Sequence, residues 1–113
     1  MTLAEMVRRI IIDPRKLTEY ALDPESPRGR HKAYVFKKVL GFTQENSGDL
    51  LTQIEEQAPT AEATFHSQDE FGRRYTVDVP VQGSESQRAI VRTGWLIRHG
   101  ADEAQLVTLY VKR

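Results

Sequence analysis

The hydrophobic period of the chain changes after Pro59, and this change restricts the fold more than any other feature. Before Pro59, apolar residues recur three and four positions apart, which is typical of helices that bury one face. After it, apolar and polar residues alternate, which is typical of strands. The sequence therefore predicts an α+β fold, with helices over about residues 14–58 and an antiparallel sheet over about residues 61–112.

The polar links within the second half are short, and short links favour antiparallel neighbours. We expect four strands at about residues 61–67, 72–81, 88–98 and 104–112, with the N-terminal helices packed on one face of this four-stranded sheet. Ahead of them, Pro14 begins a short helix, Gly41 ends a second helix, and Ser47 caps a third that stops at Pro59. Residues 1–12 are ambiguous, and a short helix continuing into a strand fits them.

The overall composition limits the classes of function. The 113 residues predict a single domain, 1–113, and the net charge of zero disfavours a protein that coats nucleic acid by charge alone. The absence of cysteine and of a long apolar stretch predicts a cytoplasmic protein with no membrane contact. Three widely separated histidines give little support to a metal site, so no metal and no cofactor are expected.

A basic run opens the second helix. Residues 28–38 hold five Arg or Lys residues and no acidic residue, whereas residues 45–70 hold acidic residues and no Arg or Lys. Cations at a helix N-terminus are unfavourable for stability, but together with free backbone N–H groups they suit an anion. Lys32 also falls on the apolar stripe of this helix, so it must reach past the sheet edge or find an anion.

Strand alternation predicts one polar face of the sheet. Thr93 and Trp95 are expected in the core, and a register slip of one residue would move both to the polar face. A solvated face is the ordinary interpretation of such a surface. The polar face is expected to hold Arg74, Thr76, Asp78, Arg92, Thr108, Tyr110 and Lys112.

Several motifs resemble a small, uncharacterised bacterial domain family whose genes often lie in toxin–antitoxin or polymorphic-toxin loci. The helical motifs are Lys16-Leu17-x-x-Tyr20-x-Leu22 and Gly29-Arg30-His31-Lys32-Ala33-x-x-Phe36-x-x-x-Leu40-Gly41. The strand motifs are Tyr75-x-Val77-Asp78-x-Pro80, Val91-Arg92-Thr93-x-Trp95-x-Ile97 and Leu106-Val107-Thr108-x-Tyr110. The likeness extends from about Pro14 to Lys112.

More distantly, the element order and the patterns Gly-x-x-Lys-Ala-x-x-Phe and Leu-x-Thr-x-Tyr are similar to the barnase, EndoU, colicin and RelE-like ribonuclease toxins. This resemblance implies a RelE/barnase-like sheet and metal-independent RNA cleavage, in which a ribose 2′-hydroxyl attacks the adjacent phosphate. Such cleavage needs a base, an acid and cations on the phosphoryl oxygens. It also implies an acidic antitoxin or immunity protein as partner, and a monomer or small homo-oligomer.

The resemblance assigns roles to particular residues. His31 is the titrating candidate, because histidine changes charge near neutral pH. The general acid is His31, Tyr110 or a lysine, and His66 and His99 lie apart from this set. Trp95 would stack on a base only with the slipped register. The expected catalytic residues are His31, Lys32, Arg92, Thr108 and Tyr110, and the expected substrate-binding residues are Arg28, Arg30, Arg74, Trp95 and Lys112.

Three functions are therefore compared. The first is a toxin-type endoribonuclease that acts on transfer or messenger RNA. The second is a non-catalytic module of the same fold that binds RNA or protein, of the phage- or defence-associated kind, which the neutral net charge and the missing second histidine favour. The third is a protein-facing, immunity-like adaptor whose interface is the acidic helix around Glu55 and Glu56.

Overall fold

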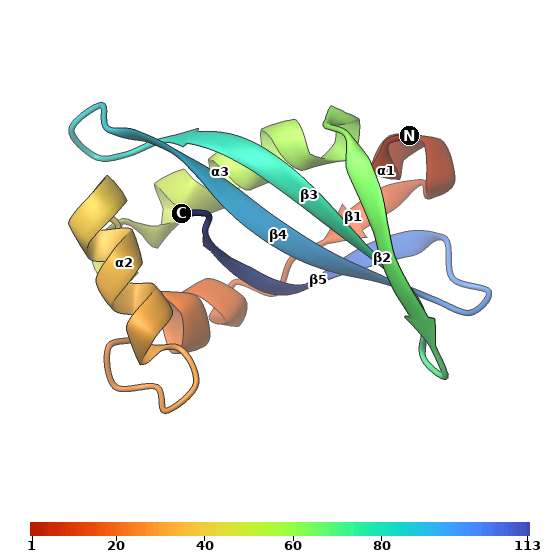
Figure 1. The fold of residues 1–113 in the computed structure, drawn as a ribbon, viewed down its shortest axis with the longest axis horizontal. Helices are drawn as coiled ribbons and strands as arrows, with labels where there is room; N and C mark the ends of the chain where they lie inside the picture. Colours follow the sequence, from red (N-terminus) through yellow and green to blue (C-terminus); the bar gives the residue numbers. More distant parts are fainter.

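The computed structural model describes all of residues 1–113 and is built on a five-stranded sheet (Figure 1). The strands follow the spatial order β1-β5-β4-β3-β2. The four long strands pair antiparallel, and the short β1 pairs parallel to β5. Their bounds are β1 Arg9–Ile11, β2 Ala63–Asp69, β3 Gly72–Gln82, β4 Arg88–Arg98 and β5 Glu103–Val111.

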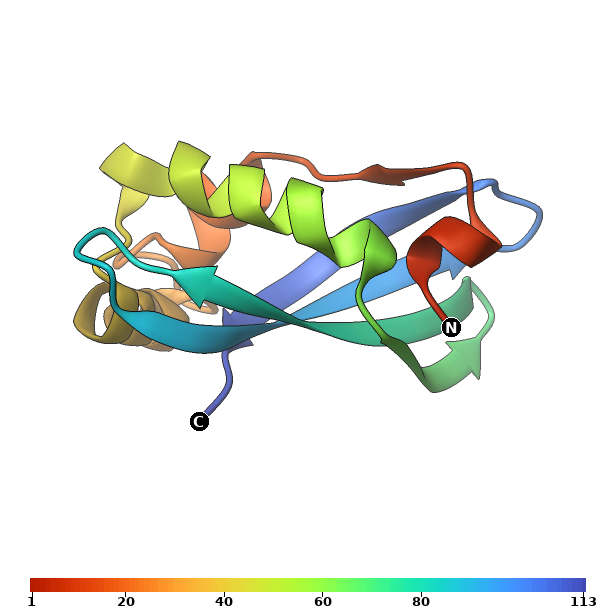
Figure 2. The ribbon, with the colours of Figure 1, turned by 90° about the horizontal axis from the view of Figure 1, so that it is seen from above.

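The helices lie on one face and at one end of the sheet. Figure 2 shows α3 lying across one face, α2 lying at one end, and no helix on the opposite face. None of these helices has the length and apolar character that crossing a bilayer requires. Their bounds are α1 Leu3–Met6, η1 Leu17–Ala21 (one π-helical turn), α2 Arg30–Leu40, η2 Gln44–Asn46, α3 Ser47–Gln57 and η3 Ala58–Thr60.

The predicted α+β class is confirmed, and the expected sheet is corrected in one respect. The sheet has five strands and is mixed, because Arg9–Ile11 adds a parallel edge strand beside β5. A strand of three residues is too short to display an alternating pattern, and its pairing with a segment more than ninety residues away is a tertiary contact. The hydropathy pattern therefore could not identify its place in the sheet.

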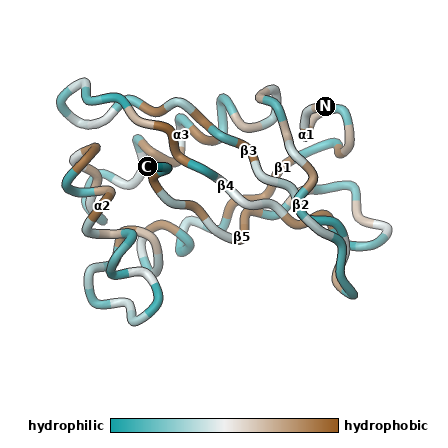
Figure 3. Tube along the Cα trace, viewed as in Figure 1, coloured by the Kyte–Doolittle hydropathy of each residue, from teal (hydrophilic) through white to brown (hydrophobic).

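The core lies between α3, α2 and the covered face of the sheet. Trp95 and Phe36 are fully buried there, and Figure 3 shows apolar and polar segments interspersed along the central strands. The Trp95 indole N–H donates to Thr93 Oγ1 at 2.7 Å, and Thr93 Oγ1 donates to the Val77 carbonyl at 2.7 Å. Both polar groups are thus satisfied inside the core. The predicted register of β4 is confirmed, and the slipped alternative is wrong.

The predicted faces of β5 hold only in part, because this strand contains a β-bulge. Gly94 pairs with Thr108, but Trp95 pairs with Leu106, so Val107 is an extra residue. Leu106 is consequently buried in the core, whereas simple alternation placed it on the polar face. Thr108 and Tyr110 stay on the polar face, as expected, and the half-buried Val107 lies beside η1.

The two ends of α2 depend on glycines. Gly41 ends the helix in the left-handed conformation, with φ of 72°, as its position predicted. At the other end Gly29 is the N-cap residue, and Ser26 Oγ accepts a hydrogen bond from Gly29 N–H at 3.1 Å. A Cβ on Gly29 would lie 1.8 Å from the Tyr20 carbonyl oxygen. This close approach fixes the start of α2 against η1.

We expect the substitution Gly29→Ala to destabilise the protein by about 1–3 kcal/mol, the usual cost of forcing extra volume into a tight contact. A matched control is Gly48→Ala in α3, where the added Cβ meets nothing within 4 Å. That change should stabilise the protein by up to about 1 kcal/mol, because alanine favours helix more than glycine does. Urea unfolding of both variants measures the two effects, and effects of the same sign would contradict this account.

Candidate functional site

The ammonium group of Lys32 lies where α2, η1 and β5 meet. Its Nζ donates to Thr108 Oγ1 at 3.0 Å and also to the Tyr20 hydroxyl. The same Nζ lies 4.6 Å from the centre of the Tyr20 ring and 5.6 Å from the centre of the Tyr110 ring. Three segments that are distant in sequence thus enclose one cation, and both of its hydrogen-bond partners are hydroxyl oxygens.

No carboxylate forms an ion pair with Lys32, although this lysine is half-buried. Burial of a cation without a counter-charge is unfavourable, and here it is offset in part by the two hydroxyls and the two aromatic rings. Burial of Tyr20 raises the pKa of its phenol, but the hydrogen bonds with Lys32 and Thr108 and the charge of Lys32 outweigh burial and lower this pKa below its ordinary value. Tyr20 therefore ionises at a lower pH than an ordinary tyrosine.

A second polar cluster lies on the same sheet face, around Arg92, whose partner Tyr110 is two residues from Thr108 along β5. Arg92 pairs across the sheet with Asp78 on one side and Tyr110 on the other. Its Nε and Nη2 donate to the two oxygens of Asp78 at 2.8 and 3.0 Å, and Lys112 Nζ donates to Asp78 at 3.2 Å. Hydrogen bonds from Arg92 and then Lys112 hold the pKa of Asp78 below its usual value despite some burial. Arg92 is therefore neutralised, unlike Lys32.

Four of the predicted site residues lie outside both clusters. Trp95 is fully buried, so its indole has no surface to offer to a base. Arg74 Nε is bound to Asp69 at 2.7 Å at the β2–β3 turn. Arg30 lines a different hollow, on the outer side of α2. His31 is exposed in the first turn of α2 and makes no side-chain hydrogen bond or ion pair.

A hollow of about 460 Å³ adjoins the Lys32 cluster on the η1 side. Lys16, Tyr20 and Val107 form part of its wall, and the exposed Arg28 lines it too, so this predicted residue does lie near Lys32. No group of three or more His, Asp or Glu side chains in the protein is placed to hold a metal ion. The Lys32 cluster offers a cation, hydroxyls and phenols, and the hollow beside it adds further cations and two carboxylates.

Tyr20 and Lys16 were not among the predicted site residues, although both lie in the first helical motif. One feature of the sequence did point to Tyr20. A lysine on a buried stripe needs a polar partner, and a tyrosine on the preceding buried stripe carries a hydroxyl at the end of an apolar ring. The spacing of twelve residues between Tyr20 and Lys32 gives no local rule that would join them.

Removal of the Lys32 charge is expected to raise the pKa of Tyr20. In Lys32→Met the hydrogen bond and the positive charge are lost while burial remains, so the phenol should ionise at higher pH. NMR titration of ring-labelled tyrosine, assigned with Tyr20→Phe, measures the shift. Lys38→Met is the matched control, because Lys38 lies over Tyr34 instead. The same Tyr20 pKa in both variants would contradict the geometry.

The chain was compared with known families, curated proteins and solved structures. No curated protein matches it, and no solved structure matches it. A family model matches residues 2–113, which is nearly the whole chain, and that family is described as a domain of unknown function. The protein therefore belongs to the DUF6883 family.

Proposed function

We propose that this protein is a metal-independent endoribonuclease that holds the scissile phosphate at Lys32. The observation that carries the proposal is the position of the Lys32 ammonium, which is half-buried at the polar sheet face and bound only by the hydroxyls of Tyr20 and Thr108. A cation that lacks a carboxylate partner favours an incoming anion. RNA offers such an anion beside a nucleophile, since each phosphate neighbours a ribose 2′-hydroxyl.

In the proposed cleavage step, two phenols, Tyr20 and Tyr110, each transfer one proton. Lys32 and Thr108 donate hydrogen bonds to the non-bridging oxygens of the phosphate. The Tyr20 phenolate accepts the proton of the 2′-hydroxyl, and the 2′-oxygen forms a bond to phosphorus. The bond from phosphorus to the 5′-oxygen breaks, and that oxygen takes a proton from Tyr110. The products are a 2′,3′-cyclic phosphate and a free 5′-hydroxyl.

Support for Tyr20 as the base comes from its pKa and from its position. The phenolate is favoured by Lys32, and Lys32 also binds the phosphate, so base and electrophile are held by the same group. The rate, as kcat/KM, should rise with pH as the phenolate forms and level off below pH 10.0, the ordinary pKa of tyrosine. A rate that falls as the pH rises over this range would contradict Tyr20 as the base.

The decisive test is cleavage of RNA in the presence of excess chelator. Wild-type protein is expected to release a product ending in a 2′,3′-cyclic phosphate, and a 2′-deoxy substitution at the cleaved nucleotide should block the reaction. Tyr20→Phe and Lys32→Met should each lower the rate by about 10²-fold or more, because each removes a base or a charge on the phosphate. Product ends are identified by mass spectrometry.

Controls separate the site from the general charge of α2. Lys38→Met removes a cation from the same helix but leaves the Tyr20 environment intact, so its rate should stay close to that of the wild type. His31→Ala and Arg92→Ala test two of the other expected catalytic residues. Full activity of both Tyr20→Phe and Lys32→Met, in variants shown by circular dichroism to be folded, would remove the basis of the proposal.

A non-catalytic RNA-binding module is the second candidate. Two observations favour it: Arg92 already donates both its hydrogen bonds to Asp78, and the exposed His31 has no polar partner that would orient it. On this view Lys32 would hold a phosphate without cleavage. Salt-dependent binding of RNA with no scission after long incubation, and loss of binding in Lys32→Met, would select this candidate over the enzyme.

A further inference from the structure

We propose that the hollow between η1 and β5 binds a second backbone phosphate, so that the substrate is an RNA strand read across at least two consecutive phosphates. This inference rests on the proposed function, because Lys32 is taken to bind the first phosphate. The two places are adjacent: Tyr20 is part of the wall of the hollow, and its hydroxyl contacts Lys32. Val107, the extra residue of the β5 bulge, forms the wall beside Thr108.

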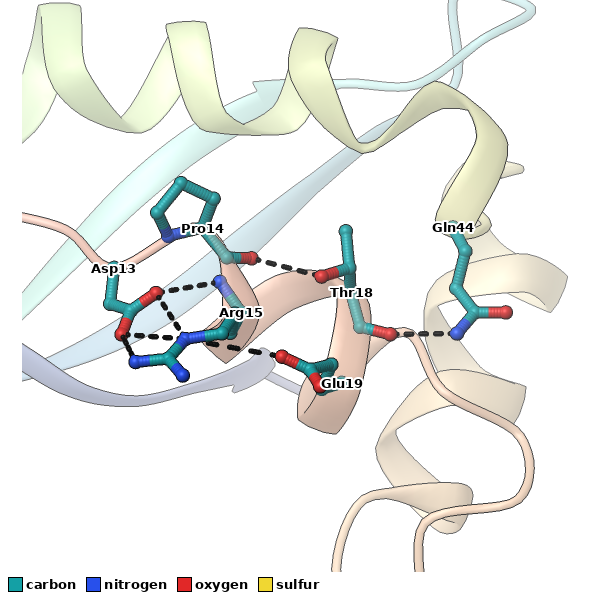
Figure 4. Close-up of polar contacts among 6 residues, drawn as sticks. All are labelled: Asp13, Pro14, Arg15, Thr18, Glu19 and Gln44. Atoms are coloured by element: carbon teal, nitrogen blue, oxygen red, sulfur yellow. Dashed lines mark hydrogen bonds and ion pairs between the residues drawn. The ribbon is translucent and has the colours of Figure 1, made fainter.

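The cations of the hollow differ in whether they are already neutralised. Figure 4 shows Arg15 bound to Asp13 and directed to Glu19. The distances are 2.7 Å from Arg15 Nη2 to Asp13 and 3.9 Å from Arg15 Nε to Glu19. Lys16 and Arg28 line the same hollow and form no ion pair. Arg15 thus pairs with both carboxylates but carries one charge against their two, and neither Lys16 nor Arg28 is bound to a carboxylate.

The charge of the hollow stays positive at neutral pH. The hollow is lined by three cations, two carboxylates and the Tyr20 phenol, which gives a net charge of +1 while the phenol is neutral, and the Lys32 charge lies next to it. The hydrogen bonds from Arg15 lower the pKa of Asp13 to about 2, so this carboxylate remains paired with Arg15 instead of exchanging protons near neutrality. A lysine and an arginine that are not bound to carboxylates, around a hollow of about 460 Å³, suit a phosphate.

The ends of η1 are held, which gives the hollow a fixed wall. Thr18 Oγ1 donates to the Pro14 carbonyl at 3.4 Å, and the Thr18 carbonyl accepts from Gln44 Nε2 at 2.7 Å (Figure 4). Gly29 also packs directly against the Tyr20 carbonyl. Lys16 and Arg28 are therefore carried by segments whose relative position is fixed by backbone contacts, and a ligand would meet them together.

The test compares two uncleavable 2′-O-methyl RNA ligands, a dinucleoside monophosphate with one phosphate and a trinucleoside diphosphate with two. Binding is measured by NMR titration. The wild-type protein should bind the longer ligand more tightly, by about tenfold, which corresponds to one charge-assisted hydrogen-bonded contact. The double variant Lys16→Gln/Arg28→Gln should lose this advantage and bind the shorter ligand as the wild type does. Lys32→Met should weaken binding of both.

Three further variants sharpen the test. Lys37→Gln/Lys38→Gln removes two cations from the outer part of α2 and should leave both affinities unchanged. Glu19→Gln removes a negative charge from the rim and should strengthen binding of the longer ligand by about twofold. The conservative pair Lys16→Arg/Arg28→Lys keeps the charges and should retain most of the advantage. The plot of log K against log salt for the longer ligand has a negative slope. This slope should become less negative by about 0.7 in the double glutamine variant, because one phosphate contact is lost.

The outcomes distinguish this inference from the function on which it rests. Equal affinity of wild type for the two ligands, or an unchanged advantage in the double glutamine variant, would overturn the second phosphate site while the Lys32 site stands. The same holds if Lys37→Gln/Lys38→Gln loses the advantage equally, since the effect would then be one of overall charge. Binding of neither ligand by wild type would overturn both proposals.

Discussion

The contact of Lys32 with Tyr20 and Thr108 is the interaction on which the organisation of this site depends. Through this one ammonium group, α2, η1 and β5 converge on the edge of the polar sheet face. The close approach of Gly29 to the Tyr20 backbone sets the start of α2. It thereby also sets the position of Lys32, which lies in the first turn of that helix. The Lys32 charge is stabilised by two hydroxyl groups and two aromatic rings, but no negative charge balances it.

Much of the fold could be predicted from local patterns, because those patterns report burial of one face of each element. The period change after Pro59, the stop at Gly41 and the core position of Trp95 all follow from such patterns, and the structure has them. The patterns failed where pairing decides the conformation. The bulge at Val107 moves Leu106 into the core, and no local feature of the strand marks it, since its place is set by the register with β4.

The candidate site shows the same division. The residue types that carry charge could be named from the sequence, and Lys32, Thr108 and Tyr110 do lie together. The contacts between them could not be predicted, because the hydrogen bond from Lys32 to Thr108 joins residues 76 positions apart. Arg92 illustrates the limit most clearly. Its place on the polar face was predictable by alternation, yet its neutralisation by Asp78 depends on the cross-strand register, which the sequence pattern does not supply.

The two cationic clusters on this face therefore have different chemical meaning. A phosphate that approached Arg92 would compete with a carboxylate that already uses two donors of the guanidinium and is also bound by Lys112. A phosphate that approached Lys32 would displace no carboxylate, and the Thr108 hydroxyl could donate to the same phosphate. The exchange at Lys32 thus brings an anion to a cation that has no carboxylate partner, whereas the exchange at Arg92 frees a carboxylate beside the anion. On electrostatic grounds an anion is accommodated more readily at Lys32 than at Arg92, because the Arg92 guanidinium is already paired with Asp78.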